Sequence, residues 1–280
     1  MKKAWIVFLL LITNAAAFSL FGSHPNVDRQ YLDAVRDVRD IVITTQKTRG
    51  LTNNFMNGNV VAQLLVYGER KNMKENFKKL EALFASMENL PAGYRKKAEA
   101  LMERARKLNK KAFRRKSAEV FDAYTGIIEE WLALNREMID GRFGGKDAAI
   151  YEMLLFQNET LLPLTENIGK MRGLGSGIVA RGRCNEKETP KMLGFADEIE
   201  RYRKAMTAFL QRRPLVAGEE LEAVNGKIGA YVKLTRTKVI GKKGIRLDPN
   251  AYFDQGTACI GAVSKIYDEV SAEIDRKIGK

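Results

Sequence analysis

The sequence predicts an all-α protein made of two four-helix bundles, packed side by side and related by an internal duplication. Proline is scarce, with 6 in 280 residues, and apolar residues recur at steps of three and four, as they do in helices. Three glycines between residues 141 and 145 divide the helical segments into two groups. The pentapeptide Lys-x-Arg-Gly-Leu occurs at residues 47–51 and again at residues 170–174, once in each group.

Interruptions of the helical periodicity divide the chain into four helices before the glycine-rich break and four after it. We expect them at residues 27–57, 60–88, 91–115, 117–140, 147–182, 190–212, 218–240 and 249–278. The two copies of the pentapeptide then lie near the C-terminal ends of the first and fifth helices. The repeat is therefore one of position as well as of sequence.

Prolines mark several of the expected helix starts. Pro91, Pro190 and Pro249 each stand at or near a first helical position, where a missing N–H leaves no helical hydrogen bond unmade. Thr189 and Asp248 precede the last two prolines, and both residue types are good N-caps.

Two further breaks involve glycine and proline. Gly241 and Gly244 end the seventh helix and separate it from the eighth. Pro163 lies inside the fifth predicted helix, where it should kink the helix or mark its true start.

The N-terminus has the pattern of an export signal. Two lysines at residues 2 and 3 precede an apolar run over residues 4–12, and three alanines follow at residues 15–17. We therefore expect a signal peptide over residues 1–17, its cleavage, and a periplasmic or otherwise exported protein. The alternative is that the segment is retained as an N-terminal membrane anchor.

The domain boundaries follow from the signal and the glycine-rich break. We expect a first four-helix half over residues 18–144 and a second over residues 145–280. Together they would form one domain over residues 27–278.

A strongly basic segment accounts for most of the net charge of +14. Residues 95–116 contain eleven Lys or Arg and two Glu, a net charge of +9. An exported protein is not expected to meet nucleic acid, so this segment is either a solvated helix face or a contact surface for anionic lipid or an envelope polymer.

The sequence gives no sign of a metal site, a cofactor or an enzyme. The single histidine, His24, has no neighbouring ligand, and Cys184 and Cys259 lack metal-ligand spacing. The two cysteines could form one disulfide if the fold brings them together. We find no nucleophile elbow, phosphate loop or ligand set, so we expect no catalysis.

The repeated arginine interrupts an apolar helix face in both halves. The first stripe is Val35, Val38, Val42, Thr45, Arg49, Thr52, Met56, and the second is Leu154, Asn158, Leu161, Thr165, Ile168, Arg172, Gly175, Val179. A guanidinium removed from water costs several kcal/mol unless a negative or hydrogen-bonding partner compensates it. Each arginine therefore requires a partner in the fold.

The sequence leaves three possibilities for these arginines. A carboxylate from a neighbouring helix could pair with each one, an anionic ligand could bind to them, or they could be exposed and idle. Thr45, Thr52 and Ser176 could supply neutral donors beside a ligand. Gly50 and Gly173 would let the two helices cross closely and bring the arginines together.

Three segments in order resemble the nitrate- and nitrite-sensing (NIT) domain family. They are Thr-Thr-Gln-Lys-Thr-Arg-Gly-Leu at residues 44–51, Glu-Asn-Ile-Gly-Lys-Met-Arg-Gly-Leu-Gly-Ser at residues 166–176, and Asp-Pro-Asn-Ala-Tyr-Phe-Asp-Gln-Gly-Thr-Ala-Cys-Ile at residues 248–260. The family shows Gln-x-x-Arg-Gly, a later Gly-x-x-Arg, and Pro-x-x-(Trp or Tyr)-Phe followed by Thr. The resemblance spans nearly the whole chain after the signal.

The resemblance implies a small oxyanion, nitrate or nitrite, held between two helical bundles by arginines from both halves. Arg49 matches the first motif arginine and Arg172 the second, with Gln46 and Lys170 beside them and Arg181 as a further candidate. The predicted anion-binding set is Arg49, Arg172, Lys47, Thr45, Thr52, Ser176 and Arg236.

We therefore expect an exported anion-binding sensor module that passes its signal to a partner protein. The alternative is a helical envelope protein without a sensing role, which binds a partner or an anionic membrane surface through its basic helix.

Overall fold

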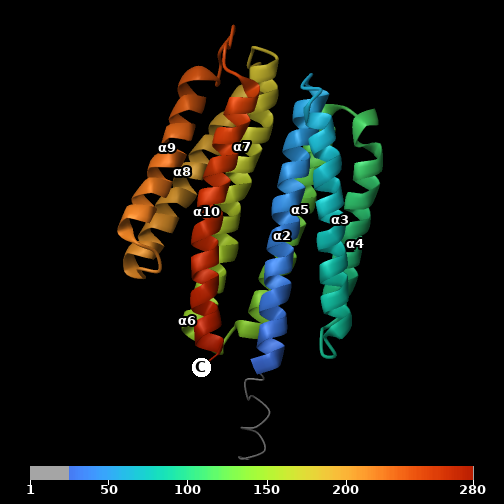
Figure 1. Cartoon of the computed structure of the whole chain (residues 1–280), viewed down its shortest axis with the longest axis vertical. Coiled ribbons are helices and arrows are strands. Elements are labelled where there is room, and N and C mark those ends of the chain that lie inside the picture. The colour runs from blue at the N-terminus through green and yellow to red at the C-terminus, as the bar shows by residue number, and fades with distance from the viewer. Residues whose placement is uncertain (1–24, 280) are drawn as a thin grey trace, which may run out of the picture.

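The helices form two bundles that stand side by side (Figure 1). This architecture comes from a computed structural model, which describes residues 25–279. The described chain is all-α, so the predicted fold class is confirmed. The predicted signal peptide, residues 1–17, and His24 lie outside the described residues.

The first bundle contains four helices that run alternately up and down the molecule (Figure 1). They are α2 (Pro25–Met56), α3 (Ala62–Ser86), α4 (Ala92–Lys111) and α5 (Ser117–Phe143). A short 3₁₀ turn, η1 (Ala112–Arg114), joins α4 to α5. Their apolar faces meet in a core that includes Ile41, Phe77 and Trp131, and the last two rings stack at 6.4 Å.

The second bundle repeats this arrangement with one interrupted helix. Its elements are α6 (Ala148–Phe156), η2 (Gln157–Leu161), α7 (Leu162–Ala180), α8 (Glu188–Arg212), α9 (Gly218–Lys238) and α10 (Pro249–Ile278). Phe156 and Phe209 stack in its core with ring centroids 3.8 Å apart. The link from α5 turns at Gly145, whose φ of 78° favours glycine. Common descent of the two halves stays a prediction.

Pro163 loosens the fifth predicted helix without breaking it. A proline lacks an N–H and its ring crowds the carbonyl four residues earlier, so the helix before Pro163 widens into the π turn η2. The buried Gln157 in this turn donates to the Tyr267 carbonyl at 2.9 Å and to Ser271 Oγ at 2.8 Å. The turn thereby joins α7 to α10.

The helix boundaries agree with the sequence expectation to within four residues. Asp248 caps α10 as predicted, because its Oδ1 accepts from the Asn250 N–H at 2.8 Å. The prediction that Thr189 caps the sixth helix is wrong. Asn185 and Glu188 form a reciprocal capping box, in which each side chain accepts from the other's backbone N–H, at 2.9 and 3.0 Å. A helix can therefore begin before Pro190, at Glu188.

The possible disulfide is not formed. Cys184 and Cys259 are both free and both buried. The Cys184 Sγ lies 3.5 Å from Thr189 Oγ1, in the connection between α7 and α8. The Cys259 thiol donates to the Lys227 carbonyl at 3.6 Å, between α10 and α9, and burial raises its pKa to about 11. The two thiols therefore lie in different places in the second bundle and do not contact each other.

The two bundles meet where α2 crosses α7. A Cβ placed on Gly173 would lie 3.1 Å from the Gly50 Cα, so a larger residue there would force the two backbones to move apart. Asn53 of α2 donates to the Gly173 carbonyl of α7 at 2.7 Å and ties the crossing together. We call this contact between α2 and α7 the seam.

The two ends of the molecule differ. α2 begins and α10 ends at the lower end, whereas the turns α2–α3 and α4–α5 lie together at the upper end (Figure 1). Among residues 25–279, no helix is both long and apolar enough to cross a membrane.

Candidate functional site

Both repeated arginines lie at the seam, and both are buried. Arg49 is 0% exposed and Arg172 is 1% exposed, and they are among the largest fully buried side chains. Burial is the largest effect that lowers the pKa of Arg172, and the two arginines are near enough for the charge of Arg49 to lower it further. The structure therefore brings together the two cations that the sequence singled out.

Arg49 has a carboxylate and a hydroxyl as partners, and its Nε alone lacks a hydrogen-bond partner among the described residues. Its Nη1 and Nη2 donate to the two carboxylate oxygens of Glu166 at 2.5 and 3.1 Å, and Nη1 also donates to Thr125 Oγ1 at 2.9 Å. Its guanidinium carbon lies 4.8 Å from the centre of the Phe121 ring. The buried Glu166 therefore forms a bidentate ion pair across the seam and neutralises Arg49.

Lys170 adds a second cation beside this pair. Its Nζ lies 3.7 Å from Glu166 Oε1 and 3.1 Å from the exposed Glu129 carboxylate. Glu166 thus faces two basic side chains, and it is the buried carboxylate of the site.

Arg172 has no such carboxylate. Its Nη1 donates to Thr257 Oγ1 at 2.8 Å, and its guanidinium carbon lies 4.4 Å from the centre of the Phe253 ring. Its buried Nε and Nη2 atoms have no hydrogen-bond partner among the described residues. Arg172 forms no ion pair within residues 25–279, unlike Arg49, Arg39 and Arg36. The Nε–Nη2 edge is therefore an unused fork of N–H donors.

Burial lowers the pKa of Arg172 from its ordinary value to about 10. The cause is loss of hydration, which destabilises the charged form. The side chain is still cationic at neutral pH.

Close packing holds Arg172 in place. A Cβ on Gly256 of α10 would lie 2.9 Å from the Arg172 Cβ and 2.8 Å from the Tyr231 hydroxyl oxygen of α9. The next ring, Tyr252, donates to the Met171 carbonyl at 3.3 Å. Burial raises the pKa of Tyr231 well above its ordinary value, so this phenol stays neutral beside the arginine.

A cleft connects Arg172 with the surface. It has a volume of about 340 Å³ and lies between α2, α3 and α10. The lining includes Arg172, Phe253 and Thr257 on one side and Lys47, Leu64 and Leu65 on the other. We call it the Arg172 cleft. Lys47 is half-buried there, with its Nζ 3.9 Å from Glu69 Oε1, so this pair carries no net charge of its own.

Gln46 and Thr52 are further buried polar groups on α2. Both amide atoms of Gln46 and the hydroxyl of Thr52 have no hydrogen-bond partner within the part of the chain that the structure describes. Gln46 lies beside Gly169, which also borders the Arg49 Nη2 atom. The seam thus holds several polar groups that the protein itself leaves unpaired, and buried groups of this kind are rare in native structures.

The remaining predicted site residues have local partners. The Thr45 hydroxyl donates to the Ile41 carbonyl at 2.7 Å, and the Ser176 hydroxyl donates to the Gly173 carbonyl at 3.2 Å. Both belong to the seam, but each hydroxyl proton is used within its own helix. Arg236 donates to Asp197 at 2.6 Å on the outside of α9 and α8, so it lies away from both arginines. We therefore correct the predicted set by removing Arg236.

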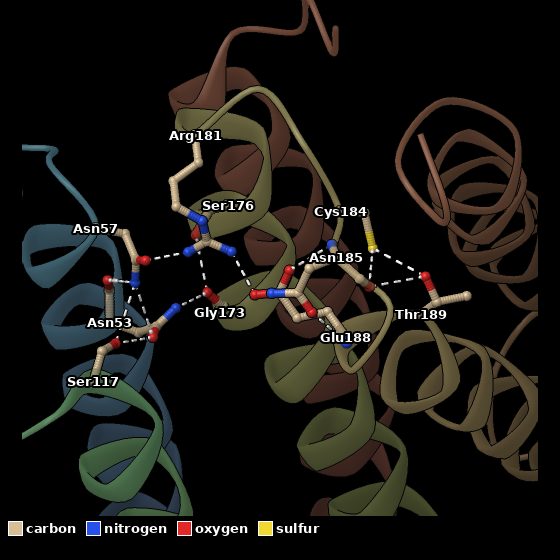
Figure 2. A network of polar contacts seen from close by, with 10 residues as sticks. All are labelled: Asn53, Asn57, Ser117, Gly173, Ser176, Arg181, Cys184, Asn185, Glu188 and Thr189. Atoms are coloured by element: carbon tan, nitrogen blue, oxygen red, sulfur yellow. Dashed lines mark hydrogen bonds and ion pairs between the residues drawn. The ribbon is translucent and has the colours of Figure 1, made fainter. Parts of the chain in front are cut away.

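A polar network lies at the upper end of the seam (Figure 2). Arg181 donates to Asn57 of the first bundle and to Glu188 of the second. Asn57 donates to the Asn53 carbonyl at 2.7 Å, and Ser117 donates to Asn53 Oδ1 at 2.6 Å. The network borders a second cleft of about 450 Å³ between the bundles. Arg181 thus joins the two bundles close to the Asn53 that contacts Gly173.

The sequence pattern missed several residues of the site. Glu166, Thr125 and Thr257 contact the arginines, but none was a predicted ligand. Glu166 lies within the second quoted motif, on the helix that carries Arg172, so an acidic residue inside a motif built around an arginine was a usable signal. Thr257 is the threonine of the third quoted motif, so the resemblance contained a signal for it, whereas Thr125 lies outside the three motifs and only the fold could identify it. In the described residues, no cluster of three or more His, Cys, Asp and Glu is suited to a metal ion.

Comparisons with known proteins agree with this architecture. The family model described as nitrate and nitrite sensing matches residues 40–275. The solved structure of the NasR transcription antiterminator superimposes with a TM-score of 0.74 at 13% sequence identity, covering 96% of this chain and 74% of that chain. At this identity the likeness concerns the fold. A comparison with curated protein sequences gives no significant match.

Proposed function

We propose, from the premise that the chain belongs to the nitrate- and nitrite-sensing family, that it binds one of these anions at the seam, with Arg172 as the principal cation. The resulting change would be passed to a partner protein. The expected signal peptide would make this an exported, periplasmic sensor. The proposed site consists of Arg172 and Thr257, with Arg49, Gln46, Lys47 and Thr52 around them.

The observation that carries the proposal is the unpaired fork of Arg172. A buried guanidinium without a carboxylate is unfavourable by several kcal/mol, and proteins ordinarily avoid it. The Nε and Nη2 atoms lack partners among residues 25–279, although Arg49 in the matching position has two carboxylate oxygens. A small oxyanion would supply both the missing charge and the missing acceptors.

The shape of the fork favours a planar anion. Two parallel N–H groups of a guanidinium match two oxygens of a planar oxyanion, which an ammonium group cannot do. Nitrate and nitrite have this geometry, and a single negative charge balances the one uncompensated cation. The Arg172 cleft provides the route from solvent.

Glu166 would set the charge of the site. Because it neutralises Arg49 through two hydrogen bonds, the two arginines together hold one excess positive charge rather than two. A site of this charge suits a monovalent anion. A divalent anion such as sulfate would leave an uncompensated negative charge out of water.

Binding would couple to the relation between the bundles. Arg172 belongs to α7 and α10 holds its hydroxyl partner Thr257, whereas the Arg172 cleft is closed on the other side by α2 and α3. An anion would compensate the buried charge of Arg172 and favour a closer seam. The Arg181 bridge to Asn57 and Glu188 would respond to the same movement (Figure 2).

The test is thermal unfolding with nitrate, nitrite, sulfate and chloride at equal ionic strength. We expect nitrate or nitrite to raise the free energy of unfolding by about 2.7 kcal/mol at a hundredfold excess over the Kd. Sulfate and chloride should have little effect. The substitution Arg172→Met should remove the response, whereas the matched control Arg236→Met should retain it. Equal responses to all four anions would contradict the proposal.

A further inference from the structure

An exposed apolar patch lies at the upper end of the first bundle. Val60, Val61, Leu64, Leu65 and Tyr67 occupy the turn after α2 and the first turns of α3, and they are 71%, 73%, 78%, 53% and 52% exposed. We call these five residues the apolar tip. They lie within eight residues of the chain, and exposed apolar groups of this kind mark interaction sites.

A basic turn adjoins the apolar tip. Residues 110–116, at the end of α4 and in η1, contain five exposed basic side chains and no acidic one: Lys110, Lys111, Arg114, Arg115, Lys116. Both this turn and the apolar tip belong to the upper end of the molecule, opposite to the start of α2 and the end of α10 (Figure 1).

Aromatic contacts join the two features directly. The Phe113 ring of the basic turn lies 6.3 Å from the Tyr67 ring of the apolar tip and 4.9 Å from the Phe55 ring beneath it. Arg70 of α3 lies over Phe113, with its guanidinium carbon 4.5 Å from the ring centre. The exposed apolar and basic side chains therefore form one continuous surface.

Most of the positive charge of this surface has no carboxylate partner within the described fold. Lower on α4, basic side chains pair with carboxylates of neighbouring helices. These pairs are Lys97 with Glu137 at 2.6 Å, Arg104 with Glu130 at 2.5 Å, and Arg106 with Glu81 at 2.7 Å. In the basic turn, Arg115 alone has a carboxylate within 4 Å among residues 25–279, that of Glu119 at 3.5 Å. The excess charge thus lies beside the exposed apolar groups.

We propose that the apolar tip and the basic turn together dock the protein on an anionic lipid surface. Lysine and arginine near a charged leaflet are attracted to it without needing a matched partner geometry. Valine, leucine and tyrosine side chains at the same end can enter the boundary between headgroups and acyl chains. Charge and apolar area would thus act on the same surface.

Other occupants fit the surface less well. Two copies of this chain would bring two strongly positive tips together, which is unfavourable. An acidic protein would satisfy the charge, but the cores of protein interfaces are depleted in lysine, and three of the five basic residues here are lysine. A lipid surface satisfies both the charge and the protruding apolar side chains.

The test is sedimentation of the full chain with vesicles of phosphatidylcholine alone or with added phosphatidylglycerol. We expect binding to the anionic vesicles that weakens as salt rises. The charge variant Lys110→Gln/Lys111→Gln/Arg114→Gln should partition about a hundredfold less, at about fivefold per residue. Its matched control, Lys96→Gln/Lys204→Gln/Lys227→Gln, removes the same charge from exposed positions elsewhere and should change little.

The apolar contribution has its own variant. Val60→Ser/Val61→Ser should weaken partition about tenfold, and serine at residue 61 suits the start of α3. The control Leu193→Ser changes an exposed leucine on α8 and should bind like the wild type. All variants share the same N-terminal segment, so a difference in vesicle binding among them reports on the apolar tip and the basic turn.

Several results would overturn the proposal. These are equal binding to neutral vesicles, wild-type binding by either tip variant, or an equal loss in the control triple variant. Capture of polyglutamate without binding to anionic vesicles would instead assign the surface to an acidic protein. The nitrate response is a separate readout, since residues 60, 61 and 110–116 do not line the Arg172 cleft. Failure of one proposal therefore leaves the other testable.

Discussion

Arg49 and Arg172 occupy matching positions in the two halves, are equally buried, and have opposite electrostatic surroundings. Arg49 faces the carboxylate of Glu166 and is neutralised inside the protein. Arg172 faces a threonine hydroxyl and an aromatic ring, and keeps an unpaired fork of donors. The repeated sequence therefore supports two different tasks, because the neighbours of each copy come from different helices.

This comparison distinguishes an arginine that stabilises the fold from an arginine that is available to bind a ligand. Around Arg49 the buried charge is compensated when the chain folds, so the pair contributes to holding α2 against α7. The charge of Arg172 has no partner within the described fold, so it is available to a ligand and destabilises the protein while no ligand is bound. Ligand binding and folding stability should accordingly respond to different substitutions.

The largest expected effect is on stability, and it compares the same substitution at both positions. Arg49→Met removes the bidentate partner of the buried Glu166 and leaves it only Lys170, whose Nζ is 3.7 Å away, so we expect the free energy of unfolding to fall by about 3 kcal/mol. Arg172→Met replaces an unpaired cation by a side chain of similar length, so stability should be unchanged or higher. Urea unfolding of the two variants measures the difference. Equal losses in both variants would mean that the two arginines have equivalent surroundings.

The second effect concerns the crossing that brings the arginines together. A Cβ on Gly173 would lie 3.1 Å from the Gly50 Cα and 3.2 Å from the Phe121 ring, so Gly173→Ala should cost about 1–3 kcal/mol by separating the helices. Gly261→Ala on α10 meets no atom within 4 Å and should stabilise by up to about 1 kcal/mol. Thermal unfolding gives both values. A stable Gly173→Ala protein with normal nitrate binding would show that the close crossing is dispensable.

The third effect changes the charge of the site without changing its shape. Glu166→Gln removes the negative charge that neutralises Arg49, so nitrate affinity should rise about tenfold through the added cation. Calorimetric titration measures this change. Glu129→Gln is the control, because it removes an exposed carboxylate that faces Lys170 but not Arg49. An affinity that falls in Glu166→Gln would show that the ion pair positions the ligand rather than competing with it.

The smallest effect concerns pH. The pKa of Arg172 is about 10 in the folded protein and higher in the unfolded chain, so below about pH 10 the buried charge destabilises the fold. The destabilisation is relieved as the pH rises through 10. Nitrate affinity should be constant between about pH 6 and 9 and about fourfold weaker near pH 10.5, since the neutral guanidine does not attract an anion. A decline already below about pH 9 would point to a different group.

Helical periodicity and helix-end residues were sufficient to predict most of the fold. The predicted segments agree with the observed helices to within a few residues, because proline, glycine and capping side chains act locally. The predicted cap of α8 was the exception. There the Asn185 and Glu188 capping box decided the boundary, although Pro190 gave the more visible signal.

The site could be predicted only in part. The apolar stripes identified Arg49 and Arg172 as buried cations, and Gly50 and Gly173 indicated the crossing. The sequence could not show which arginine is paired with a carboxylate. That pairing depends on which neighbouring helix packs against each arginine in the fold. Arg236 was wrongly included because a position on one helix does not determine which neighbouring helix it faces.

The most direct test is a calorimetric titration of nitrate into the wild type, Arg172→Met and Arg236→Met under identical salt conditions. The account predicts saturable binding of one anion per chain in the wild type and in Arg236→Met, and none in a folded Arg172→Met protein. Undiminished nitrate binding by Arg172→Met would contradict the claim that its unpaired guanidinium is the receptor for the anion.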